Sequence, residues 1–163
     1  MNFKRYLPSR EFPPYAFIPG KHTHPEKPGG HMENIEVSTQ KLDQNNYFSN
    51  EEYLYGIDLF NYHYYWESHV WWESLWNVAG RKGDDADFLK GLIKLAAAGV
   101  KINLKQDEAA AGHIKRALEI LSPLSKDQNN WFGIELNSLI SQLDALVIGS
   151  EVEDFFKLKL FIN

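Results

Sequence analysis

The chain contains no cysteine, and this absence removes a whole class of chemistry. Disulfides, thiolate nucleophiles, iron–sulfur clusters and cysteine-based zinc sites are all excluded. Basic residues are also scarce, since 17 Lys and Arg stand against 22 Asp and Glu, for a net charge of −5. A domain without a net basic field does not gather phosphates, so we expect no nucleic-acid partner.

Long hydrophobic runs are missing as well. The most apolar stretch, residues 91–104, is interrupted by Lys94 and Lys101 and is too short to span a bilayer. The first residues include two basic side chains but no apolar segment after them, which does not favour a secretory signal. We therefore expect no membrane partner and a cytoplasmic location.

Several catalytic signatures are absent from the sequence. It has no His-Glu-x-x-His, no phosphate-binding P-loop, no Gly-x-Gly-x-x-Gly and no Gly-x-Ser-x-Gly. Glu-x-x-His is also absent, which argues against a ferritin-like di-iron site. Any chemistry must therefore come from His and carboxylate side chains outside these motifs.

Proline is unevenly distributed, because six of the seven prolines lie within the first 28 residues. Pro-Pro and Pro-Gly steps prevent a continuous helix there and favour extended or turn geometry. Phe12, Tyr15 and Phe17 are nevertheless too apolar for a free tail. We expect an extended Pro/His-rich arm, residues 1–48, packed over a bundle at 49–149.

Apolar residues at spacings of three and four predict about five short antiparallel helices after the arm. The expected helices span about 51–60, 64–78, 84–100, 107–122 and 131–147. Their expected end signals are a capping box at Ser49, a cap at Asp84 or Asp85, a stop at Pro123 and a C-cap at Gly149. The fold class is therefore all-α.

The last segment, residues 150–163, has a different pattern. Residues 156–162 alternate with a period of two, which predicts an extended tail. The tail either packs on its own bundle or pairs with a partner chain, so a homo-oligomer is possible.

Aromatic residues are what the sequence has in excess, at 14%, and four of the five Trp fall between residues 66 and 76. On a helical wheel, one 120° arc of this helix holds Tyr65, Trp66, His69, Trp72, Glu73 and Trp76. The opposite side is also apolar, and Glu67 and Ser74 mark a narrow polar edge. We therefore expect a central helix with His69 and Glu73 buried among aromatic rings.

A buried His–Glu pair one helical turn apart has three interpretations. The two side chains satisfy each other and fix the helix register, or they belong to a ligand pocket walled by aromatics. The third is a divalent metal site, for which zinc needs one more protein ligand. His24, His31 or His113 could supply that ligand.

Two parts of the sequence resemble a known family. Phe60-Asn61, then YWESH at 65–69 and ESLW at 73–76, resemble the core of the bacterial Domain of Unknown Function 309 (DUF309) family. Residues 87–98 and 109–121 are similar to its next two helices. In the arm, FPPYAFIPG at 12–20, His24-Pro25 and Gly30-His31 resemble members with a Pro/His-rich N-terminal extension.

The resemblance implies short antiparallel helices similar to tetratricopeptide hairpins, and a role for His24 and His31 beyond packing. It implies no activity. The chain departs from the family pattern at Val70, where the family has a Glu, and at Lys90 and Lys94, where it has Gln. A carboxylate-rich metal site would therefore be weaker in this chain.

The leading hypothesis is a helical domain that binds a small ligand or a peptide partner in an aromatic pocket. The expected walls are Trp66, His69, Trp72, Glu73 and Trp76, covered by Tyr15, His24 and His31. Glu73 would accept a hydrogen bond from the ligand or hold His69 in one tautomer. The alternatives are a hydrolase using His69 and Glu73, with or without a divalent metal, and a structural or scaffold protein.

Overall fold

The computed structural model describes residues 3–32, 40–148 and 152–163. Its described helices are α1 (Glu51–Asn61), α2 (Tyr65–Val78), α3 (Asp84–Asn103), α4 (Asp107–Asp127) and α5 (Leu136–Ile148). Two strands, β1 (Asn130–Trp131) and β2 (Ile134–Glu135), and two 3-10 turns, η1 (Tyr47–Ser49) and η2 (Val152–Lys157), complete the elements. The predicted all-α bundle is confirmed. No helix in these ranges has the length and apolar character needed to cross a membrane.

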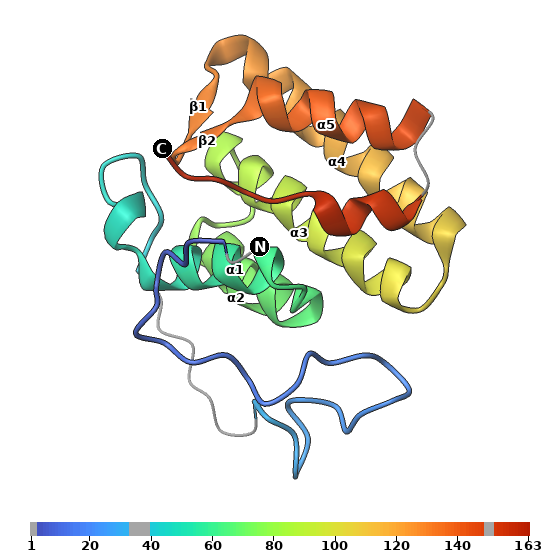
Figure 1. Ribbon diagram of the computed structural model, residues 1–163. Coiled ribbons are helices and arrows are strands. Elements are labelled where there is room, and N and C mark those ends of the chain that lie inside the picture. The colour runs from blue at the N-terminus through green and yellow to red at the C-terminus, as the bar shows by residue number, and fades with distance from the viewer. Residues whose placement is uncertain (1–2, 33–39, 149–151) are drawn as a thin grey trace.

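Each helix packs mainly on the next one along the chain, from α1 to α5. Figure 1 shows α4 and α5 at one end of the bundle, and the arm, in blue, on the opposite side next to α1 and α2. The Pro-rich part of the arm therefore lies on the side of the first helical pair, away from α4 and α5.

Two predicted helix caps are displaced by one residue. Asn50, and not Ser49, caps α1, and its side-chain oxygen accepts a backbone N–H of the first turn at 3.1 Å. Gly83, with φ at +90°, precedes α3, so that Asp84 and Asp85 lie inside the first turn. Carboxylates in a first turn still stabilise the helix, because they face the positive end of its dipole.

Pro123 does not end α4, so this prediction is wrong. The helix continues for one more turn, to Asp127. A proline inside a helix costs about 3 kcal/mol. Leu124, directly after it, is buried in the core, and its carbonyl accepts a hydrogen bond from Trp131 Nε1 at 3.3 Å. Tertiary contacts of this turn thus offset the local penalty.

The fifth helix begins at Leu136, five residues later than predicted, because a β-hairpin precedes it. Phe132 and Gly133 form its two-residue turn with φ at +48° and +84°. Left-handed conformations at both turn residues suit the twist of a tight antiparallel hairpin. The predicted C-cap, Gly149, lies outside the described residues.

The tail packs on the bundle of its own chain. The side-chain amide of Asn61 donates to the Leu160 carbonyl at 2.8 Å and accepts the Leu160 N–H at 2.7 Å. The Ile162 N–H donates to the hydroxyl of Tyr6 at 2.8 Å, and Lys159 Nζ lies 2.8 Å from His63 Nε2. Side chains of the arm, of the end of α1 and of the α1–α2 turn therefore take the place of a neighbouring strand.

Replacing Asn61 with alanine should destabilise the fold by about 2–4 kcal/mol, because two buried backbone groups of Leu160 lose their partners. Urea unfolding measures this loss. The matched control is Asn45→Ala at an exposed position, which should change stability by less than about 0.5 kcal/mol. Equal losses in the two variants would contradict the proposed anchoring.

The arm is held on α1 by one buried carboxylate. Asp58 is 1% exposed, and it accepts the backbone N–H groups of Tyr6 and Leu7 at 2.8 and 2.9 Å. The guanidinium of Arg5 adds an ion pair at 3.3 Å and lies over the ring of Phe12. These contacts fix the first part of the arm and direct the following residues towards α2.

Candidate functional site

Helix α2 organises the candidate site because its side chains point in three directions. Tyr65 and Trp72 face the bundle, where they contact Gly99 and Gly56. Residues facing the arm include Glu67 and Trp71, and those lining a cleft towards solvent are Trp66, His69, Val70, Glu73, Ser74 and Asn77. The predicted 120° arc therefore spans the bundle side and the cleft side, and its members do not all share one pocket.

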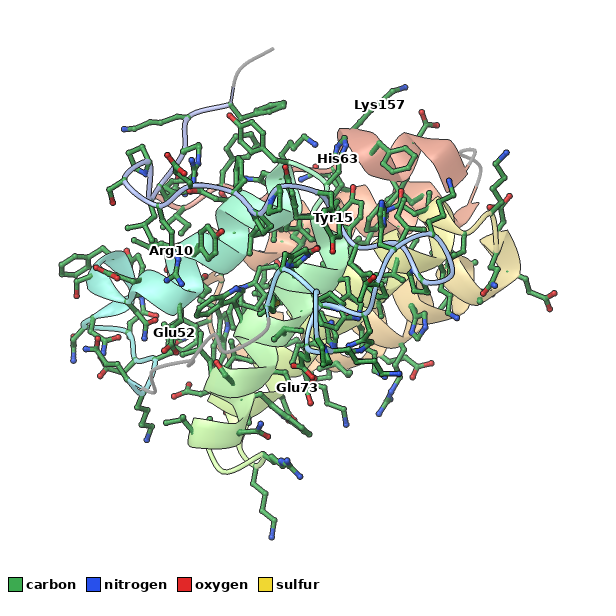
Figure 2. The ribbon with its side chains drawn as sticks, turned by 90° about the horizontal axis from the view of Figure 1, so that it is seen from below. Arg10, Tyr15, Glu52, His63, Glu73 and Lys157 are labelled. Atoms are coloured by element: carbon green, nitrogen blue, oxygen red, sulfur yellow. The ribbon has the colours of Figure 1, made fainter. Side chains whose placement is uncertain are left out.

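The cleft, of about 460 Å³, lies between α2 and the arm residues His24 and Glu26. Four predicted site residues come together in its wall, namely His24, Trp66, His69 and Glu73. Figure 2 views the molecule from the arm side, with the arm in front of α1 and α2 and Glu73 at the edge of the molecule beyond the arm. The cleft opens to solvent there.

His69 and Glu73 form a pair, but the prediction that they are buried is wrong. Their side chains are 27% and 47% exposed, and His69 Nε2 lies 3.2 Å from Glu73 Oε2. His69 Nδ1 lies 2.7 Å from the carbonyl oxygen of Trp66, to which it can only donate. In a neutral ring, Nε2 is then an acceptor that faces a carboxylate oxygen. With the ring neutral, the pair presents two hydrogen-bond acceptors to the cleft.

Two of the predicted pocket residues lie elsewhere. The Trp72 side chain is 0% exposed and packs between Gly56 and Phe60 in the core. Trp76 is half-buried against the same core, and the guanidinium of Arg81 lies 5.0 Å from its ring centre. Neither ring lines the cleft, so the aromatic wall consists of Trp66.

Tyr15, which is partly buried, and His31, which is buried, belong to a cluster beside the cleft. Their rings pack edge to face at 4.8 Å, and His31 Nε2 lies 2.8 Å from Glu67 Oε1. The same oxygen accepts the backbone N–H of Phe17 at 2.6 Å. Glu67 was expected on the polar edge of α2, yet it is 0% exposed. This edge of α2 is polar because Glu67 forms hydrogen bonds with the arm. The sequence did not indicate Glu67 as a functional residue.

Burial raises the pKa of Glu67 above its ordinary value. The N–H of Phe17 and the ring of His31 lower it again in part, because both stabilise the carboxylate form. The pKa of this carboxyl group therefore depends on the arm residues that contact it.

A metal site finds no support in the arrangement of the described residues. No three His, Asp or Glu side chains among them are grouped closely enough to hold a metal ion. His113 lies on α4, and its pKa is lowered by burial and by the charges of Lys94 and Lys101. It does not line the cleft and cannot complete a set with His69 and Glu73.

Residues 53–112 match the model of a protein family, and these residues include most of α1, all of α2 and α3, and the beginning of α4. The family is DUF309, a domain of unknown function. The match supports the DUF309 resemblance of the helical core. It includes Trp66, His69 and Glu73, whereas the arm residues His24 and Glu26 precede it. No curated protein and no solved structure gives a significant match to the chain.

Proposed function

We propose that this protein binds a small organic cation, a primary ammonium or a guanidinium, in the cleft between α2 and the arm. The cation is either a free molecule or the end of a basic side chain in a peptide. The negative charge of the cleft carries this proposal. Its described lining contains two carboxylates, Glu26 and Glu73, and two histidines, His24 and His69. Lysine and arginine do not occur among the described residues of that lining.

The hydrogen-bonding geometry supports a donor-rich ligand. His69 Nε2 and Glu73 Oε2 both face the cleft as acceptors when the ring is neutral, only 3.2 Å apart. An ammonium or guanidinium group carries several N–H donors and can satisfy both atoms. The ring of Trp66 adds an apolar and electron-rich surface, which attracts cations more strongly than carboxylates.

Binding is better supported than hydrolysis. A hydrolase that forms a covalent intermediate needs a side-chain nucleophile whose proton the His–Glu pair can accept. Ser74 supplies the hydroxyl group in the cleft lining, but its Oγ donates to the carbonyl of Trp71 at 2.8 Å. The His69–Glu73 pair is therefore better placed to receive a ligand than to activate this serine.

The test is a comparison of three small aromatic probes of similar shape. Benzamidine and benzylamine should bind, whereas benzoate should not, as measured by ligand-observed NMR and isothermal titration calorimetry. Glu73→Gln should weaken benzamidine binding about three- to tenfold, because the variant loses a charge-assisted hydrogen bond at a half-exposed position.

The matched control is Glu119→Gln, an exposed glutamate on α4 outside the cleft lining. This variant should bind benzamidine as the wild-type chain does. Binding of benzoate with equal affinity, or equal losses in the two glutamine variants, would overturn the proposed preference for cations.

A further inference from the structure

Residues 17–31 of the arm form a loop whose two ends meet at one carboxylate oxygen. Glu67 Oε1 accepts the N–H of Phe17 at 2.6 Å and lies 2.8 Å from His31 Nε2. The side chains of His31 and Glu67 are 2% and 0% exposed. A single buried atom of α2 therefore ties both ends of the loop to the bundle.

The two sides of this loop lie close together above that anchor. A Cβ atom at Gly30 would lie 2.2 Å from the carbonyl oxygen of His24 and 2.4 Å from that of Pro25. The N–H of Met32 donates to the Pro25 carbonyl at 2.8 Å. The chain next to His31 is thus in direct contact with the segment that carries His24 and Glu26 into the cleft wall.

The loop also contacts the aromatic wall of the cleft. The rings of Phe17 and His24 pack edge to face with Trp66, at centre distances of 5.1 and 5.4 Å. Trp66 in turn packs against His69 at 5.5 Å. The loop therefore supplies one side of the cleft, α2 supplies the other, and Trp66 lies between them.

We infer that residues 17–31 act as a lid, and that docking of this lid on Glu67 is coupled to ligand binding in the cleft. His31 and Glu67 are then positioning residues for a ligand that they do not touch. The inference rests on the proposed function. A ligand that contacts Glu26 and Glu73 together binds the docked lid more tightly than the undocked one, and by linkage it stabilises docking to the same extent.

The experiment compares a histidine of the lid with one outside it. His31→Ala removes the anchor, whereas His113→Ala is the control, on α4 and outside both the lid and the cleft lining. His31→Ala should weaken benzamidine binding about fivefold or more and speed amide hydrogen exchange in residues 18–30. His113→Ala should change the affinity less than about twofold.

Two further measurements separate positioning from loss of fold. Amide exchange in α3 and α4 should stay unchanged in His31→Ala, because the anchor lies on α2. His31→Gln keeps an N–H donor for Glu67 and should recover much of the lost affinity. In the wild-type chain, benzamidine should slow exchange in residues 18–30.

The outcomes distinguish the coupling from the binding itself. If His31→Ala binds benzamidine as tightly as the wild-type chain while its lid exchanges faster, the coupling is overturned and the proposed cation site stands. If the wild-type chain binds none of the cationic probes, the proposed function is overturned, and the coupling with it.

Discussion

Gly56→Ala is expected to lower the free energy of unfolding by about 2–3 kcal/mol, although it adds a single methyl group. A Cβ at this position would lie 2.2 Å from Trp72 Nε1 and within 2.8 Å of two further ring atoms. The Trp72 ring is 0% exposed and packs against Phe60, so it cannot swing into solvent. The methyl group must therefore push α1 and α2 apart.

Gly112→Ala is the matched control for this substitution. Gly112 lies exposed on α4, and a Cβ there would meet no atom within 4 Å. Alanine should stabilise this helix by about 0.5–1 kcal/mol, because glycine loses more backbone entropy on folding. Urea unfolding of both variants should give shifts of opposite sign. Stabilisation by both substitutions would show that α2 does not pack this closely on α1.

The burial of the helices could be predicted from hydrophobic spacing. In α1, the predicted inward residues Tyr53, Leu54, Ile57 and Phe60 are all buried. In α4, four of the five predicted inward residues, Ala110, Ile114, Ala117 and Leu121, are buried, and the fifth, Leu118, is partly buried. This success has a local cause, because a period of 3.6 residues fixes which side chains share a face.

Predictions failed where distant contacts override local preference. Pro123 is a strong helix breaker, yet the turn after it is retained by the burial of Leu124 and the hydrogen bond from Trp131. The hairpin turn at Gly133 was missed because the apolar residues around it also fit a helix. Spacing alone does not separate the two when the run of residues is short.

In the candidate site, too, local spacing was predictive and distant contacts were not. His69 and Glu73 lie on one face of α2, as the spacing of four predicted, and they do form a pair. The exposure of that pair and the burial of Glu67 depend on the arm, whose contacts come from 50 and 36 residues earlier in the chain. A helical wheel gives the direction of a side chain, but it does not show what covers it.

Glu67→Ala is the second substitution with a large expected effect, a loss of about 2–4 kcal/mol. The N–H of Phe17 and the ring of His31 would both lose their acceptor at buried positions, and an unpaired buried group costs far more than a made hydrogen bond gains. Urea unfolding measures the total loss. Hydrogen exchange should locate the opening in the arm, and an arm as protected as in the wild-type chain would contradict this account.

The pH dependence of stability provides a sharper test of the same carboxyl group. Burial raises the pKa of Glu67 in the folded state, so over the range above the ordinary carboxyl value the native chain retains a proton that the unfolded chain has released. This contribution is largest at low pH and decreases as the pH rises through that range. Other carboxylates titrate as well. The useful quantity is therefore the free energy of unfolding of the wild-type chain minus that of Glu67→Gln, measured at each pH.

That difference should favour the wild-type chain most at mildly acidic pH and least at neutral pH. His31 Nε2 lies 2.8 Å from Glu67 Oε1, so the difference reports the protonation of Glu67 in the presence of this contact. A matched series with Glu119→Gln, an exposed carboxylate, should be nearly flat over the same range. A difference that instead increased towards neutral pH would show that Glu67 is stabilised as a carboxylate in the fold. Acidification would then release the lid and not tighten it.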